Sequence, residues 1–294
     1  MKKTIVTTAD NNRIELLEEL IKSIRQFREL DDYYICVLST NISNLNRQKL
    51  SKYSINFVES RWPIKVPNYR IKNRDYLRSC LSIPFINQYF PGYDIYIWID
   101  SDAWVNDPDC INLYRKSAEK MSLGVTPQLD RAYGDLAKVS WFFNIPIKIK
   151  SIYYKGIKRS INAKKAKELS MKPTLNAGVW SLHKNAPHWK VWQNLILKCA
   201  KKGRLFTADQ ISMGLMIYDE KLKAEFLPAY CNWLCEVKPF YDLKENSFVE
   251  PFLPHHKIGI MHLASLDIRN LDKLTKISTT DSQIIKRSLR YNIL

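Results

Sequence analysis

Apolar runs and amphipathic stretches alternate along the first 126 residues. Short apolar runs typical of buried strands lie at 4–8, 33–38, 55–58, 94–99 and 123–126. Segments with the apolar spacing of a helix lie between them, at 14–28, around 45–53, from about 73 to a break at Pro84, and from Asp107-Pro108 to Lys120. Because strands that alternate with helices usually pair in parallel, this pattern predicts an α/β fold with an open, mainly parallel sheet flanked by helices.

The second half of the chain carries polar residues inside its apolar segments. Residues 174–182 are expected to form a strand, with Asn176 half-buried and Gly178 allowing a close approach. A helix should run from Pro187 to Gly203, and Thr207 should cap the next one, with Gln210 at capping-box spacing. A last strand is expected at 257–263, with His262 at its end.

Two carboxylates follow the most apolar strand of the chain, in Ile-Tyr-Ile-Trp-Ile-Asp100-Ser101-Asp102. Side chains alternate along extended backbone, so Asp100 and Asp102 should point the same way and repel each other unless a cation lies between them. Oxygen ligands favour a hard divalent ion such as Mn²⁺ or Mg²⁺, and such sites usually leave positions for a substrate diphosphate. This motif predicts a metal-dependent enzyme acting on a nucleotide-activated substrate.

The composition is that of a globular protein, which we expect to be cytoplasmic. No window approaches the eighteen apolar residues of a membrane-spanning helix, and the first residues are too polar for a signal peptide. The six cysteines are therefore expected to be reduced thiols.

The net charge of +17 is concentrated in two stretches. Residues 145–172 hold nine basic side chains against Glu168, and residues 269–294 hold six against two acids. No nucleic-acid-binding signature accompanies them, so we expect no nucleic-acid partner. The alternatives are a solvated basic face or an anionic membrane surface, which would make the protein a peripheral protein of the inner membrane face.

The end of the chain has apolar and basic residues at helical spacing. Ile284, Ile285 and Leu289 alternate with Lys286-Arg287 and Arg290, which predicts an amphipathic helix that either lies in a membrane interface or docks on the domain. We accordingly divide the chain into a main domain, 1–265, and a basic amphipathic extension, 266–294.

Short motifs lie at 8–12, 76–78, 100–102, 175–179 and 208–210, and His262 follows them. Their order resembles that of the GT-A glycosyltransferases, and most closely glycosyltransferase family eight, the retaining bacterial lipopolysaccharide galactosyl- and glucosyltransferases and glycogenins. The resemblance covers residues 4 to about 263. It implies nucleotide-sugar contacts from Thr8, Ala9, Asp10, Asn12, Arg78, Ser101, Ala177 and Gly178. It implies metal ligation by Asp100, Asp102 and His262, and reaction-centre roles for Asp209, Gln210 and Asn176.

The resemblance also implies an activity. The expected reaction moves a hexose from a UDP-sugar to a glycan or lipid-linked acceptor with retention, as in bacterial cell-surface glycan or lipopolysaccharide synthesis. The family's final lysine, which should neutralise the donor diphosphate, is missing after Ser265, and Arg269 or Lys257 are the candidates to replace it. An inverting reaction would instead need a base such as Asp130 or Asp135.

Two other classes of protein remain as alternatives. A sugar-nucleotide nucleotidyltransferase also uses acidic metal sites, but it needs a glycine-rich phosphate loop near its start, and no glycine precedes Gly92. A non-enzymatic basic protein that binds nucleic acid or membrane would leave the ordered polar motifs at the strand ends unexplained.

Overall fold

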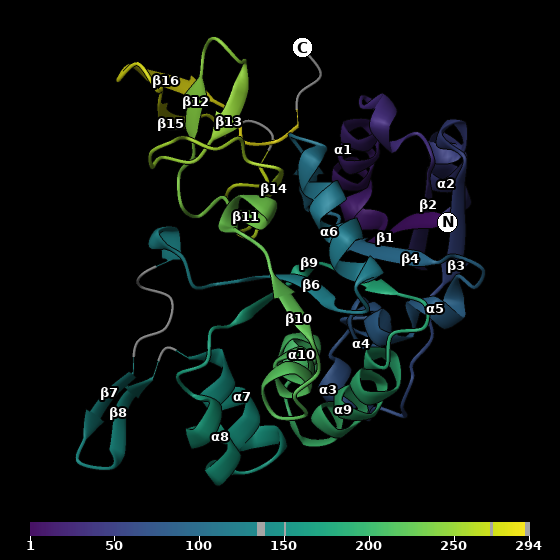
Figure 1. The fold of residues 1–294 in the computed structure, drawn as a ribbon. Coiled ribbons are helices and arrows are strands. Elements are labelled where there is room, and N and C mark those ends of the chain that lie inside the picture. The colour runs from purple at the N-terminus through teal and green to yellow at the C-terminus, as the bar shows by residue number, and fades with distance from the viewer. Residues whose placement is uncertain (134–138, 150, 271–272, 292–294) are drawn as a thin grey trace.

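The computed structural model describes residues 1–133, 139–149, 151–270 and 273–291. Its centre is a seven-stranded sheet in the order β10-β6-β9-β4-β1-β2-β3 (Figure 1). The strands are β1 (Lys3–Asp10), β2 (Tyr33–Thr40), β3 (Ile55–Glu59), β4 (Ile95–Ile99), β6 (Leu123–Pro127), β9 (Leu175–His183) and β10 (Ala224–Phe226). All neighbours pair in parallel except at β9, which is antiparallel to both β4 and β6. The predicted α/β fold with a mainly parallel sheet is therefore confirmed.

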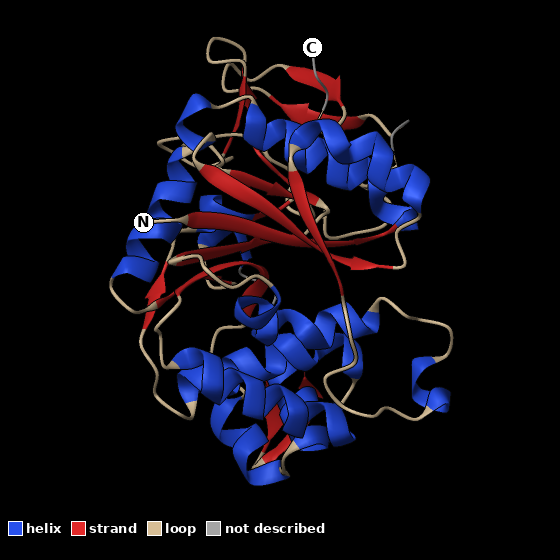
Figure 2. Cartoon of the chain, turned by 90° about the vertical axis from the view of Figure 1, so that its right-hand side faces the viewer, coloured by secondary structure: helices blue, strands red, loops and turns tan. Residues whose placement is uncertain are grey.

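Alternation along β4 explains why helices cover both faces of the sheet. Ile95, Ile97 and Ile99 belong to one apolar cluster, and Tyr96 and Trp98 belong to another. The first cluster is completed by α1 and α6, and the second by α4, α5, α7, α9 and α10. Figure 2 shows the sheet between these two groups of helices. A strand buried on both faces reads as a continuous apolar run, as this one does.

Most of the helices agree with the periodic segments of the sequence, while α3, α7 and α8 were not predicted. The bounds of the helices are α1 Ile14–Arg25, α2 Asn44–Leu50, α3 Asn68–Ile71, α4 Leu77–Ser82, α5 Ile86–Tyr89, α6 Asp109–Glu119, α7 Ile152–Ser160, α8 Ala163–Leu169, α9 His188–Lys202 and α10 Ala208–Tyr218. Pro84 lies in a 3₁₀ turn, Ile83–Phe85, that ends α4, as its missing N–H and fixed φ favour. None of the helices in the described parts of the chain is long and apolar enough to span a membrane.

The strand order places a topological switch between β1 and β4. The chain runs outward from β1 to β2 and β3, then returns to the other side of β1 as β4. Connections therefore diverge beyond the carboxyl ends of these two strands, where open α/β sheets bind their ligands. Asp10 ends β1, and Asp100 directly follows β4.

Shorter strands form a second layer beside the sheet. They are β5 (Ala103–Val105), β11 (Trp233–Leu234), β12 (Phe240–Asp242), β13 (Ser247–Val249), β14 (Ile260–His262), β15 (Thr275–Ser278) and β16 (Ile284–Arg287). The small sheet β11-β14-β5 carries His262 at the end of β14. A third apolar cluster, with Trp104, Trp233 and Phe248, lies beneath these strands.

The predicted amphipathic helix in the tail is wrong. Residues 284–287 form β16, which pairs with β15 in an antiparallel hairpin, and the turn holds Ser282 at a φ of +63°. Leu289 and Arg290 are buried against the body. The β-branched residues on both sides of the Asp281-Ser282 turn are common in strands, and this is the physical reason for the hairpin. The domain boundary at residue 265 stays a prediction.

A separate hairpin projects from the body. It consists of β7 (Val139–Phe142) and β8 (Ile145–Ile149), which pair only with each other among the described strands. In Figure 1 it lies beside α7 and α8.

Candidate active site

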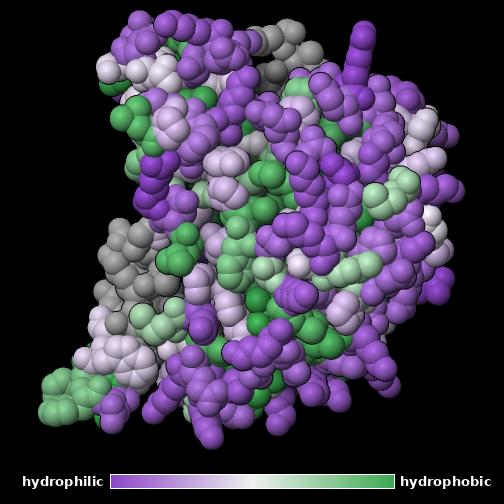
Figure 3. Space-filling view, viewed as in Figure 1, coloured by the Kyte–Doolittle hydropathy of each residue, from purple (hydrophilic) through white to green (hydrophobic). Residues whose placement is uncertain are grey.

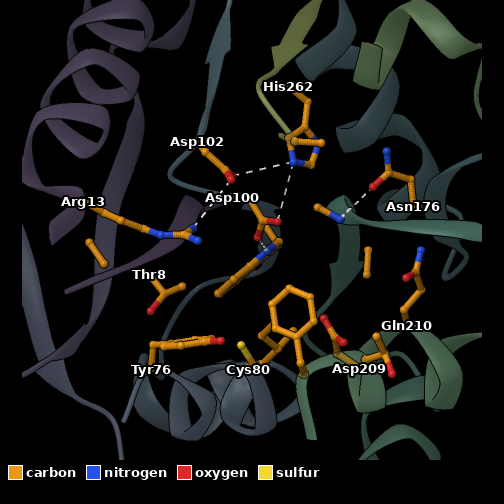
Figure 4. Close-up of a pocket in the computed structure, with 18 of the residues that line it drawn as sticks. Thr8, Arg13, Tyr76, Cys80, Asp100, Asp102, Asn176, Asp209, Gln210 and His262 are labelled. Carbon is orange, nitrogen blue, oxygen red and sulfur yellow. Dashed lines mark hydrogen bonds and ion pairs between the residues drawn. The ribbon is translucent and has the colours of Figure 1, made fainter. Parts of the chain in front are cut away.

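A cavity of about 310 Å³ opens at the switch point. Segments far apart in the sequence converge on it (Figure 4). Of the predicted site residues, its walls include Thr8, Ala9, Asp10, Asp100, Asp102, Asn176, Ala177, Gly178, Asp209, Gln210 and His262. One cavity therefore unites most of the predicted metal, donor and reaction-centre residues.

Asp100, Asp102 and His262 form a cluster with metal-ligand spacing. One ligand atom from each lies within 4.8 Å of the others. His262 Nε2 lies 3.6 Å from Asp102 Oδ1 and 3.9 Å from Asp100 Oδ2. β4 delivers the carboxylates, and β14, paired through β5 with the segment after them, delivers the imidazole.

The histidine is held in the tautomer that a metal ligand needs. Its Nδ1 lies 3.0 Å from Asn232 Oδ1, which can only accept, so Nδ1 carries the proton and Nε2 presents a lone pair to the carboxylates. Burial lowers the pKa of His262, while Asp102 opposes this shift. A metal-bound histidine typically donates its second N–H in this way.

The two carboxylates have few hydrogen-bond donors around them. Trp98 Nε1 donates to Asp100 Oδ1 over 2.8 Å, but Asp102 Oδ1 is buried without a hydrogen bond. Burial, and then the neighbouring Asp102, hold the pKa of Asp100 well above its usual range. A buried acceptor without a donor is costly. This oxygen, the second carboxylate and the neutral imidazole fit a divalent cation such as Mn²⁺ or Mg²⁺.

Gly178 is required where β9 passes the cluster of Asp100, Asp102 and His262. A Cβ on this residue would collide with the His262 ring and lie 3.0 Å from Asp100 Oδ2. The backbone comes equally close, since Asp100 N donates to Gly178 O over 2.8 Å. The glycine of the Asn176-Ala177-Gly178 segment therefore lets the strand lie directly against the cluster.

Asn176 and Gln210 lie side by side at the cavity wall. Gln210 Nε2 donates to Leu175 O over 2.9 Å, and Asn176 Oδ1 accepts from Gly178 N over 3.2 Å. These bonds fix both amides, while Asn176 Nδ2 is buried without a partner. An orphaned donor at a cavity is available to a ligand oxygen.

Asp209 lies in the first turn of α10 and lines the same cavity. Burial raises its pKa to about 6. The predicted capping box is wrong: the chain enters α10 through a 3₁₀ turn, Leu205–Thr207, and Thr207 makes no side-chain cap. Gln210 is thereby free to reach Leu175, and Asp209 to face the cavity.

Two arginines supply positive charge. Arg269 Nη2 pairs with Asp102 Oδ2, and Arg13 Nη1 lies 3.6 Å from the same oxygen. The Arg269 guanidinium is anchored by Leu263 O at 2.7 Å and Ala264 O at 2.9 Å. Of the two cations considered for the missing lysine, Arg269 lines the cavity, whereas Lys257 lies elsewhere and pairs with Glu245.

Three predicted donor contacts lie outside the cavity lining. The Arg78 guanidinium is engaged by Glu59 and by Asn41 Oδ1 at 2.9 Å. Ser101 is buried, and Asn12 is exposed beside Asp10, whose side chain accepts from Asn12 N. The alternative base Asp130 caps a turn through Ala132 N and also lies outside the lining, while Asp135 falls outside the described residues.

Sequence reasoning missed several lining residues. They are Arg13, Thr40, Tyr76, Cys80, Trp98, Gln128, Phe206, Glu236 and Ala264, among others. Arg13 directly follows the Asp10-Asn11-Asn12 motif, so its position was a usable signal. Tyr76, which directly precedes α4, and Phe206, in the turn before α10, meet edge to face at 6.3 Å. Nothing in the sequence links those two segments.

Comparison with solved structures identifies the fold. The chain is similar to the galactosyltransferase LgtC in complex with donor and acceptor sugar analogues (TM-score 0.55, 14% identity, 92% of this chain and 90% of that one). It is also similar to the bifunctional glycosyltransferase WbbM (0.52, 17%, 82% and 39%) and to the glycosyltransferase GlyE of Streptococcus pneumoniae (0.52, 13%, 92% and 57%). The chain thus spans 39% of WbbM and most of LgtC.

The fold is that of the GT-A glycosyltransferases, and the predicted resemblance to them is confirmed at this level. No protein-family model matches the sequence, and the comparison with curated proteins gives no match.

Proposed function

We propose that this protein is a metal-dependent glycosyltransferase that moves a hexose from a UDP-sugar to a glycan or lipid-linked acceptor with retention. The observation that carries the proposal is the convergence of Asp100, Asp102 and His262 with Asp209 and Gln210 on one cavity at the switch point of a GT-A fold. The nucleotidyltransferase alternative has no comparable support, because β1 is followed by Asn11–Arg13 and not by a glycine-rich loop.

Charge in the cavity suits departure of a diphosphate. Asp100, Asp102 and His262 would hold a Mn²⁺ or Mg²⁺ ion, which supplies Lewis-acid neutralisation of the leaving phosphate when bound. Arg13 and Arg269 add two guanidinium groups beside Asp102. Arginine forks match phosphate oxygens, so Arg269 is our candidate for the role of the missing lysine.

The opposite wall suits the sugar. Cleavage of the sugar–phosphate bond leaves positive charge on the anomeric carbon, which a nearby oxygen stabilises. Asp209 is a carboxylate that could act as a nucleophile, and Gln210 is held by Leu175 with its Oε1 still available. Asn176 would orient sugar hydroxyls through its orphaned Nδ2. The uridine is assigned to Thr8, Ala9 and Asp10 by resemblance alone.

A thermal-shift panel tests the class of enzyme. UDP-sugars with Mn²⁺ should raise the Tm, because a ligand that binds only the native state stabilises it by about 2.7 kcal/mol at a hundred times its Kd. GDP and CDP should shift the Tm less than UDP. Asp102→Asn should lose the Mn²⁺-dependent shift and the transferase activity while keeping the fold. Stabilisation by GDP above that by UDP, or full activity in excess chelator, would contradict the proposal.

The stereochemistry is tested separately. Retention predicts that NMR of the product linkage gives the same anomeric configuration as the donor. Inversion would require a general base in place of Asp209 and Gln210, with Asp130 or Asp135 the residues to test.

A further inference from the structure

The β7–β8 hairpin has several large apolar side chains that the described residues of the protein leave exposed. Phe142, Ile145 and Ile147 are each at least 60% exposed, and Phe143 at the tip is 86% exposed. Adjacent residues on a strand point to opposite faces, yet both Trp141 and Phe142 are exposed. Both faces of the hairpin therefore carry exposed apolar side chains at these two positions. Figure 3 shows this hydrophobic tip projecting from the molecule.

The turn of the hairpin is unusual for its sequence. Phe143 has a φ of +51°, a left-handed conformation that tight hairpin turns normally give to glycine, asparagine or aspartate. Its ring packs edge to face on Phe142 at 4.8 Å. A bulky aromatic residue at this position is disfavoured both by its backbone and by its exposure to water. Such a cost is expected where the side chain has an apolar binding partner.

The helices beside the hairpin present positive charge. Lys155, Lys158, Arg159, Lys164, Lys167 and Lys172 are all exposed on or after α7 and α8. Within the described residues, none of these six forms a salt bridge, and the acid of this stretch, Glu168, pairs with the half-buried Lys165. Exposed basic side chains therefore lie on the helices beside the apolar tip.

We propose that the β7–β8 hairpin and the basic face of α7 and α8 bind the anionic surface of a lipid bilayer. Tryptophan, phenylalanine and isoleucine side chains enter the interface, while adjacent lysines meet anionic headgroups. A second copy of the chain fits this surface less well, because the same cations would face each other across the contact.

The location of this surface is consistent with delivery of an acceptor. Gln128 lines the catalytic cavity, and the hairpin begins a short way further along the chain, at Val139. An enzyme bound to the bilayer would meet a lipid-linked acceptor in the same membrane, a consequence that rests on the proposed transferase function. The membrane contact itself does not.

The tail does not offer an equivalent surface. Leu289 is buried, and Arg290 is buried in a salt bridge with Glu19. The apolar and basic residues that suggested a membrane helix are therefore partly used within the fold. The hairpin, not residues 281–294, is the segment to test.

Vesicle binding with brominated lipids provides the test. Trp141 is 40% exposed, whereas the other tryptophans are buried or half-buried. Vesicles of phosphatidylcholine and brominated phosphatidylglycerol should quench its fluorescence, less so as salt rises. Trp141→Phe should remove the quenching without preventing co-sedimentation. Quenching that persists in Trp141→Phe would assign the contact to another part of the protein.

The hairpin variant is chosen to preserve the turn. In Phe142→Ser/Phe143→Asn, asparagine suits the left-handed position, so the hairpin should remain while vesicle partitioning falls at least about 10-fold. Ile284→Asn removes an equally exposed apolar side chain from the tail and is the matched control, with no expected effect. Wild-type binding by the hairpin variant would overturn the proposal.

A pair of charge variants tests the helices. Lys164→Gln/Lys167→Gln on α8 should weaken partitioning about 10- to 30-fold at low salt, since each cation near the surface contributes about a factor of five. Lys238→Gln/Lys244→Gln, exposed near β12 and β13, should have little effect. Equal losses in both pairs would reduce the contact to nonspecific attraction by net charge and would reject the assigned surface.

Two further measurements separate lipid binding from self-association and from the proposed transferase function. Sedimentation velocity without lipid should give a monomer, and a dimer dispersed by the hairpin variant would assign the surface to a second copy and reject the proposal. Hydrolysis of the donor in the absence of acceptor should be equal in wild type and hairpin variant. Vesicle binding without any donor turnover would uphold the surface while the proposed transferase function fails.

Discussion

At the residue scale, the two carboxylate oxygens of Asp102 have opposite environments. Its Oδ2 is shared by Arg13 and Arg269, and its Oδ1 is buried without a partner. Two guanidinium groups repel a divalent cation, but they attract the diphosphate that would arrive with it. Metal and nucleotide should therefore bind cooperatively, each weakly alone.

Arg269→Gln separates these two effects. Without the guanidinium on Asp102, the affinity for Mn²⁺ alone should rise, because the metal no longer competes with a fixed cation. The affinity for UDP with Mn²⁺ should fall by about 10-fold or more, the loss expected for one charge-assisted hydrogen bond. Titration calorimetry measures both. Lys257→Gln, the cation outside the cavity, is the control and should change neither affinity.

Asp209→Asn should stabilise the protein. The folded pKa of about 6 lies above the ordinary value of 3.8, so the protonated form favours folding, and that contribution is lost as pH rises through 6. Removing the charge should raise the free energy of unfolding near neutral pH by about 1–3 kcal/mol, with cavity water screening part of the effect.

The pH profile of the Asp209→Asn gain is the diagnostic. Urea unfolding should show the gain near neutral pH and its disappearance below about pH 4, where wild-type Asp209 is protonated as well. Activity should fall at all pH values. Asp281→Asn, on the exposed tail turn, is the control. A stability gain that is independent of pH would show that burial of the Asp209 charge is not its cause.

At the element scale, the sequence predicted elements whose pattern is local. The run at 94–99 and the periodic helices were found because burial on one or two faces determines the spacing of apolar residues along the chain. The tail was misread because Ile284, Ile285 and Leu289 fit a helix as well as a short hairpin. The capping box at Thr207 failed because the preceding 3₁₀ turn sets the entry of the chain. Arg13 was missed although it follows a recognised motif.

Strand β9 illustrates a role that its pattern could not reveal. It lies antiparallel between two parallel strands, and Gly178 lies against His262 and Asp100 only because of that placement. Gly178→Ala should displace His262 and Asp100 and abolish the Mn²⁺-dependent rise in Tm, while reducing the stability by only about 1–3 kcal/mol.

Gly92→Ala is the matched control for Gly178→Ala. Its φ of +94° makes a side chain unfavourable, but no atom lies within 4 Å of the added Cβ. It should therefore lower the stability by about 1 kcal/mol and leave Mn²⁺ binding unchanged. An intact manganese response in Gly178→Ala would mean that the cluster tolerates a side chain there, against the contact argument.

At the scale of the whole molecule, the C-terminal segment contacts the first helix. Arg290 Nε donates to Glu19 Oε2 over 3.1 Å, and Arg290 Nη1 donates to Arg269 O over 3.1 Å. Trp104 Nε1 donates to Leu289 O over 2.9 Å. The last residues thus join the first helix, the second layer and the segment that carries Arg269. Contacts across 271 positions leave no local pattern, which is why the sequence suggested a separate extension.

Arg290→Gln should therefore destabilise the whole molecule. It leaves Glu19, whose pKa burial already raises, without its main partner, at a cost of about 2–4 kcal/mol. Glu19→Gln/Arg290→Gln should cost less than the sum of the single changes, because no unpaired charge remains. Urea unfolding of the four proteins gives this coupling.

Deletion of 281–294 should cause aggregation, because Leu289 and its neighbours complete the third apolar cluster. A well-folded, equally stable truncated protein would show instead that the tail is an independent extension.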